Sequence, residues 1–194
     1  MACTNLTKGR GLDCNRVSGG VKFIYFSVYD EITSFAYDAV DKSTIDTIDF
    51  GGNTIYRYTV PRGSTTITDT ITGNTDAGTI FYTPTVNMVL NRLTQQDQEE
   101  IKLLGQTQVR IFAQLNATHS ATGNDVIVAL GMTNGMSLNA GTADSGAAFG
   151  DRNGYTLTFD GLEAIPFAFL EDYGSAPFDN AGFTNKAGTF PTTS

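Results

Sequence analysis

The chain has 194 residues, a length that suits one domain or one domain with arms. Its net charge is −8, it contains 13 phenylalanines, 8 tyrosines and no tryptophan, and its abundant threonine, glycine and asparagine favour strands and turns over helices. Two cysteines are too few for a disulfide framework. No apolar stretch approaches 18 residues, so we expect no membrane span.

Residues 1–20 are predicted to form an extended N-terminal arm, because they contain four glycines and show no clean hydrophobic period. Residues 1–22 hold four bases and one acid, a local charge of +3 on an otherwise acidic chain. We expect the arm to contact the acidic body of a neighbouring copy through Lys8, Arg10 and Arg16; the alternative is a solvated terminus. Cys3 and Cys14 are either a disulfide pair or two reduced thiols.

Residues 21–171 are predicted to form one mainly β domain, a β-sandwich or barrel. Val21–Phe26 is rich in aromatic and β-branched residues, as strands are. Val126–Leu130 is apolar on both faces, which indicates a central strand. Residues 139–153 are rich in glycine and alanine, and we expect them to be a flexible connection.

Residues 64–92 are predicted to form a long hairpin. Its second strand alternates from Ile80 to Arg92, which at about 3.3 Å per residue gives a strand of ~43 Å. One face is polar and carries Thr66, Thr68, Thr70, Thr83, Thr85 and Asn87, and the other is apolar and carries Ile80, Tyr82, Val86 and Met88. Asp69 lies on the apolar face, and the pattern does not explain it.

The length of this hairpin bears on assembly. A hairpin that long exceeds the core of a small domain, so we expect neighbouring subunits to pair with the excess. The alternative is a strongly bent strand that wraps a single barrel.

One short helix is predicted over residues 95–104, flanking the sheets. Thr94 stands in the N-cap position with Asp97 three residues later, as in a capping box. Residues 172–194 are polar and glycine-rich but contain four scattered aromatic residues. We predict that they form a C-terminal arm that orders on a neighbouring subunit; the alternative is a disordered tail.

The sequence offers no recognisable catalytic centre. The single histidine, His119, stands in a polar loop, and no Walker, Rossmann or nucleophile-elbow motif is present. Four aspartates between residues 38 and 49 lack the alternate spacing of a calcium loop. We therefore predict a protein with no catalytic residues, no metal site and no cofactor.

Several features together resemble the tail tube proteins of tailed bacteriophages. Leu6–Arg10 (Leu-Thr-Lys-Gly-Arg) and Cys14 precede Gly19-Gly20 and the first strand, and a long polar-faced hairpin precedes one short helix. Gly146–Phe159 contains Gly-Tyr-Thr-Leu-Thr and is followed by Glu163 and Pro166-Phe167. The resemblance covers most of residues 6–170, and the chain beyond residue 172 does not match it.

The resemblance implies a structural virion subunit that is not an enzyme. Six copies would form a ring whose hairpins join into one inner barrel, and stacked rings would conduct viral DNA during genome ejection. The polar hairpin face would line the lumen, and the apolar face would contact adjacent subunits. Its partners would be further copies, other tail proteins and passing DNA without specific binding, with no membrane, after assembly in the host cytoplasm.

Two alternatives remain open at this point. One is another virion part, such as a head-decoration or tail-completion protein. The other is a glycan-binding β-sandwich adhesin module, and the absence of tryptophan counts against it.

Overall fold

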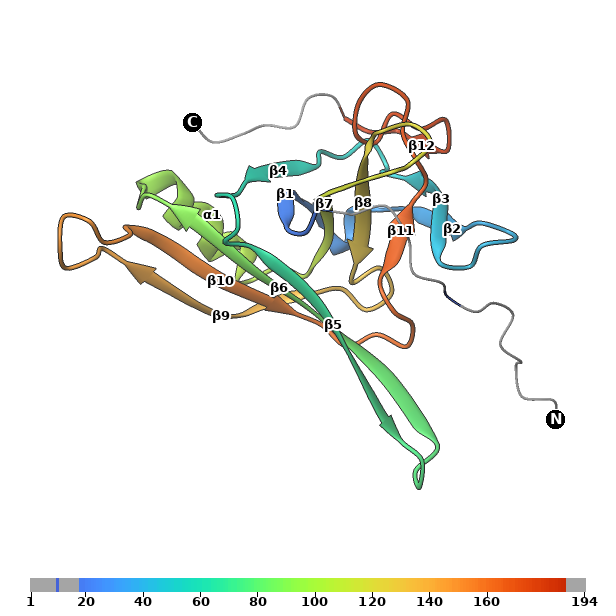
Figure 1. Cartoon of the computed structure of the whole chain (residues 1–194), viewed down its shortest axis with the longest axis horizontal. Helices are drawn as coiled ribbons and strands as arrows, with labels where there is room; N and C mark the ends of the chain where they lie inside the picture. The colour runs from blue at the N-terminus through green and yellow to red at the C-terminus, as the bar shows by residue number, and fades with distance from the viewer. Residues whose placement is uncertain (1–9, 11–17, 188–194) are drawn as a thin grey trace.

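A computed structural model describes Arg10 and residues 18–187, and it shows a mainly β chain with two sheets (Figure 1). The larger sheet has eight strands: β1 (Val21–Val28), β2 (Ser34–Tyr37), β3 (Thr44–Asp49), β4 (Tyr56–Thr59), β7 (Val109–Thr118), β8 (Asp125–Leu130), β11 (Ala168–Leu170) and β12 (Phe183–Thr184). Their order is β12-β3-β11-β8-β7-β1-β4, with β2 paired to β3. A 3₁₀ turn, Tyr29–Glu31, follows β1.

The smaller sheet has four strands: β5 (Thr66–Asn74), β6 (Thr79–Asn91), β9 (Ser137–Asp144) and β10 (Gly154–Asp160). Their order is β5-β6-β10-β9, and each neighbouring pair is antiparallel. The predicted sandwich of two sheets is confirmed, whereas the alternative of a single closed barrel is not what the described residues form.

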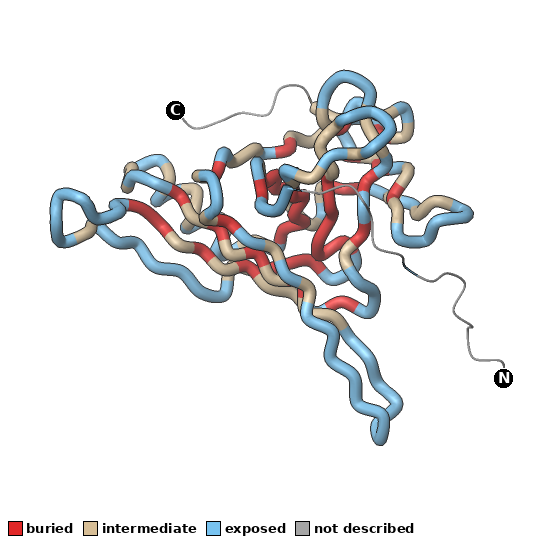
Figure 2. Tube along the Cα trace, viewed as in Figure 1, coloured by how far each residue is buried: buried red, intermediate tan, exposed pale blue. Residues whose placement is uncertain are grey.

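The main core lies between the two sheets and follows from period-2 alternation. Ile24 and Phe26 of β1 face Leu157 and Phe159 of β10, and the rings of Phe26 and Phe159 lie 5.1 Å apart. Each such buried side chain contributes about 1.5–3 kcal/mol relative to an exposed one. Figure 2 shows the buried residues concentrated on the inner stretches of both sheets.

A second core covers the other face of the larger sheet. Tyr25, Phe112 and Ile127 alternate with the residues of the main core and point away from the smaller sheet. They pack against Phe50 and Phe178. Strand β8 lies between β11 and β7, so the prediction that Val126–Leu130 is a central strand is confirmed.

The prediction of a C-terminal arm from residue 172 onward is wrong for residues 172–187. Phe178 and Phe183 are buried in the second core, and β12 pairs in parallel with β3. The domain therefore continues to at least residue 187, because this segment covers apolar surface of its own chain. The prediction for residues 188–194 falls outside the described part of the chain.

The predicted helix is confirmed as α1 (Gln95–Leu104). The Thr94 hydroxyl accepts a hydrogen bond of 3.0 Å from the Asp97 amide, which satisfies one of the amides left free at a helix N-terminus. Ile101 and Leu104 pack on the main core. Within the part of the chain that the structure describes, no helix is long and apolar enough to cross a bilayer.

The turn that positions Phe178 is stabilised by the carboxylate of Asp179, and this stabilisation depends on pH. Partial desolvation raises the pKa of Asp179, but hydrogen bonds from Ser175, Ala176 and Gly174 together lower it to about 2. A depressed folded-state pKa stabilises the fold above the unfolded pKa, and this stabilisation is lost as the pH falls from about 4 to about 2. We expect Asp179→Ala to lower the free energy of unfolding at pH 7 by about 1 kcal/mol.

The check for this effect is urea unfolding of both proteins at pH 7 and at pH 2. The difference between wild type and variant should shrink at the lower pH, where the wild-type carboxylate is being protonated. An equal difference at both pH values would show that the Asp179 carboxylate does not stabilise the turn through its charge.

Candidate assembly surface

The polar residues of the hairpin lie together on one face in three dimensions, where Phe81 and Val89 are the two apolar exceptions. In the β5–β6 register, Thr66 pairs with Asn87, Thr68 with Thr85, and Thr70 with Thr83. Directly paired residues of an antiparallel ladder project to the same side of a sheet. The six residues predicted from the sequence therefore share one face of the smaller sheet.

The polar face continues across the rest of the smaller sheet. Thr158 of β10 pairs with Asn87 and donates a hydrogen bond of 2.8 Å to its side-chain oxygen. Thr156 pairs with Thr142 of β9 and accepts a hydrogen bond of 2.7 Å from Arg152. Hydroxyl and amide groups thus extend over four strands, forming a wettable surface.

The opposite face of the hairpin divides into two parts. Val86 and Met88 are completely buried in the core of their own chain, so the prediction that they contact a neighbouring subunit is wrong. The alternation identified the apolar face correctly, but the larger sheet covers this part of it. Tyr82 is half-buried, and Ile80 is 60% exposed, so Ile80 remains available to a neighbour.

The position of Asp69 on the apolar face is explained by a contact at the root of the hairpin, where β5 and β6 leave the domain. Its carboxylate accepts a hydrogen bond of 3.1 Å from the amide of Phe167. Beside it, the backbones of Tyr82 and Glu163 exchange two hydrogen bonds of 2.8 Å. The Glu163 carboxylate also accepts hydrogen bonds from the amides of Thr133 and Asn134. These contacts hold the hairpin at a fixed angle to the domain.

Both outer strands of the smaller sheet have free edges. Strand β5 pairs with β6 on one side, β9 pairs with β10 on one side, and no other described strand pairs with either. An exposed edge presents unpaired N–H and C=O groups that can accept another strand. The two edges therefore offer two sites for backbone pairing with other chains.

Of the three bases predicted to contact a neighbouring copy, one lies within the described residues. Arg10 is exposed, and Lys8 and Arg16 lie outside the described residues. Their contact with acids of a neighbouring copy stays a prediction.

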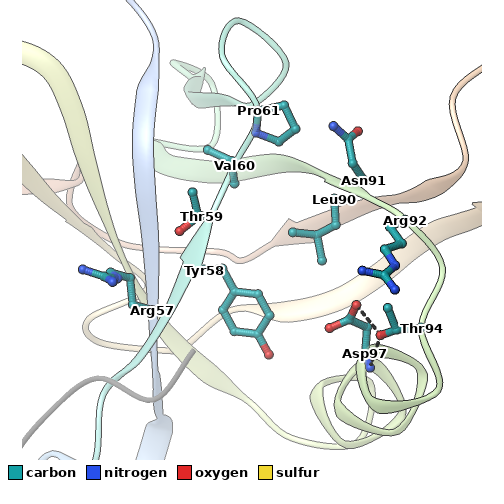
Figure 3. Close-up of a pocket in the computed structure, with 10 residues that line it drawn as sticks. All are labelled: Arg57, Tyr58, Thr59, Val60, Pro61, Leu90, Asn91, Arg92, Thr94 and Asp97. Atoms are coloured by element: carbon teal, nitrogen blue, oxygen red, sulfur yellow. Dashed lines mark hydrogen bonds between the residues drawn. The ribbon is translucent and has the colours of Figure 1, made fainter. Parts of the chain in front are cut away.

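A groove of about 410 Å³ lies between β4 and the N-terminal end of α1 (Figure 3). Its lining combines Tyr58, Val60, Pro61 and Leu90 with the charged side chains of Arg57, Arg92 and Asp97. Burial raises the pKa of Tyr58 to about 12, with a smaller contribution from the carboxylates of Glu100 and Asp97. The Tyr58 phenol is therefore protonated at neutral pH, where it is a hydrogen-bond donor rather than a base.

Arg92 has an unusual backbone conformation for its residue type. Its φ is 71°, in the left-handed region that residues other than glycine seldom adopt. The amide of Arg92 donates to the carbonyl of Asn153, and the Asn153 side chain accepts from the Leu93 amide. These bonds hold the turn between β6 and α1 and place Arg92 beside the groove.

The placement of the histidine, cysteine, aspartate and glutamate side chains among the described residues bears on metal binding. Among them, no group of three histidine, cysteine, aspartate or glutamate side chains lies together as a metal ion would need. The fold and its surfaces define a two-sheet β-sandwich with one open sheet that is polar on its outer face. No protein-family model, curated protein or solved structure matches this chain.

Proposed function

We propose that the chain is the structural subunit of a phage tail tube, in which copies join edge to edge into rings and the rings stack into a channel for DNA. The observation that carries this proposal is the smaller sheet, which has two free edges, one polar face and a hairpin that extends beyond the domain. No catalytic chemistry is required of such a subunit.

The strand directions suit ring closure. The four strands alternate in direction from β5 through β6 and β10 to β9. Because their number is even, β9 of one copy and β5 of the next run antiparallel, and the alternation continues across the junction. Repetition of this contact around a closed ring leaves the smaller sheet with no exposed edge.

The size of such a ring suits a duplex. If six copies close the ring, about 24 strands spaced by ~4.8 Å and tilted by ~40° enclose a cylinder roughly 48 Å across. Side chains occupy about 5 Å on each side, which leaves a channel wider than B-form DNA. The polar face would then line the channel, because the opposite face is occupied by the core.

The surface chemistry is also suitable for DNA passage. Threonine and asparagine side chains are hydrated and carry no positive charge. Arg152, which donates to Thr156, is a base on this face, but the chain as a whole carries a charge of −8. Tight binding of DNA rests on lysine and arginine contacts with phosphates. DNA should slide through a channel of this composition without binding tightly to its wall.

Negative-stain electron microscopy of the purified full-length chain, over a range of protein concentrations, tests the proposal. We expect hollow rings or striated tubes. Single small particles at every protein concentration and salt concentration would contradict it. A glycan array on those particles would then distinguish an adhesin module, which binds glycans, from other virion parts, which do not.

A further inference from the structure

The outer half of the hairpin carries an apolar surface that its own chain leaves uncovered. Ile71 pairs with Tyr82, and Ile80 pairs with Gly73, so the two isoleucines project to the same side as the buried Val86. They are 64% and 60% exposed, and Figure 2 shows this part of the hairpin exposed throughout. The apolar pattern of the core therefore continues along the hairpin past the point where the domain ends.

The groove between β4 and α1 lies at the opposite end of the same hairpin (Figure 1). Its lining includes Pro61, a few residues before β5, and Leu90 to Arg92, where β6 ends. The hairpin turn lies between Asn74 and Thr79, at the far end of both strands. A tip at one end and a groove at the other give a head-to-tail contact, which repeats without limit along an axis.

The tip and the groove are complementary in size and charge. A cavity of about 150 Å³ corresponds to roughly one large aliphatic side chain, so a groove of 410 Å³ has room for two. The hairpin from residue 66 to residue 81 contains two acids, Asp69 and Asp76, and no base. Asp69 is engaged at the root, and Asp76 is exposed in the turn. The groove lining holds two bases, Arg57 and Arg92, and one acid, Asp97, so its charge is positive by one.

We infer that the hairpin tip of one copy inserts Ile71 and Ile80 into the β4–α1 groove of a second copy, with Asp76 facing Arg92. This inference rests on the proposed function and deepens it, because it names the contact between successive rings. It also sets an upper limit on the axial repeat of the tube. The repeat is no longer than about 43 Å, the length of the 13-residue strand β6.

Site-specific crosslinking tests the contact without relying on ring formation. In a background with Cys3→Ser and Cys14→Ser, one preparation carries Asp76→Cys and a second carries Arg92→Cys. After mixing, a short bifunctional maleimide should join the two variants. Val40→Cys in place of Arg92→Cys is the control, because Val40 is 93% exposed in the loop between β2 and β3. Crosslinking no stronger than in this control overturns the inference.

A charge exchange gives an independent readout. Arg92→Asp and Asp76→Arg should each lower the association constant for stacking about fivefold, and the double variant should recover it. Aspartate tolerates the positive φ at position 92 better than most residues, so a folding defect is not expected. Sedimentation velocity measures the assembly, and a double variant no better than either single variant contradicts the pairing.

The outcomes also separate this inference from the proposed function. Rings or tubes that persist without the crosslink would leave the tube proposal standing and reject the hairpin contact. Crosslinked linear chains without rings would support the hairpin contact and reject ring closure.

Discussion

Replacement of Phe178 by alanine is expected to lower the free energy of unfolding by about 3–5 kcal/mol. The Phe178 ring is 1% exposed and meets the rings of Tyr25 and Phe112 edge-on, at 5.0 and 5.3 Å. Its φ of 62° is unfavourable for phenylalanine and for alanine alike, so the substitution removes ring packing without relieving backbone strain. Urea unfolding at pH 7 measures the loss.

Phe149 provides a matched control within the same chain. It lies in the loop between β9 and β10, and its side chain is fully exposed. Phe149→Ala should therefore change the free energy of unfolding by no more than about 0.5 kcal/mol. Similar effects of the two substitutions would mean that residues 172–187 do not belong to the core.

The Phe178 prediction depends on a segment that the sequence pattern misplaced. Residues 172–187 have no hydrophobic period, and their aromatic residues are separated by glycine, proline and polar residues. The hydrophobic period of a sequence indicates which face of a helix or strand is buried, but it does not show where an irregular segment packs. The second core consists of such segments laid over the larger sheet, and only the three-dimensional structure reveals it.

Most of strand β9 was missed for a related reason. Residues 139–144 read Asn-Ala-Gly-Thr-Ala-Asp, a composition typical of a flexible loop. They form a strand because β10 supplies hydrogen-bond partners along its length. Gly141 allows a close approach there, since a Cβ at this position would lie 3.0 Å from the Leu157 side chain and 3.2 Å from the carbonyl of Thr156. Small residues therefore permit close pairing, although they weaken the sequence signal.

The features that could be predicted are those with strong local causes. Alternation over 13 residues predicted the long strand, and capping residues predicted the helix to its observed bounds. The same alternation assigned the six polar residues to one face, which the register confirms. It could not distinguish Val86 and Met88 from Ile80, because coverage by another sheet is a long-range property. The contact that explains Asp69 is equally long-range, since Phe167 is 98 residues away.

If the chain forms the proposed tube, Thr83→Lys is expected to make the channel surface retain DNA. Thr83 lies on the polar face opposite Thr70 and beyond the last β10 residue, so no acid of β10 is paired directly with it. In the proposed ring of six, one substitution introduces six ammonium groups at one level of the channel. Because that channel is wider than the duplex, about two of them would contact phosphates at once, so retention should fall roughly tenfold between about 50 and 200 mM salt.

Val40→Lys is the matched control, since it adds the same charge at an exposed site in the loop between β2 and β3. Fluorescent duplex DNA is incubated with purified tubes of each variant, and retention is measured across a salt series. Retention of DNA by Thr83→Lys but not by Val40→Lys would place the threonine face toward the lumen. If residue 83 lay on the outside of the tube, both lysines would be outer charges, and the two variants should behave alike. Equal behaviour of the two variants would contradict that placement, and the polar face would then lie between subunits or outside the tube.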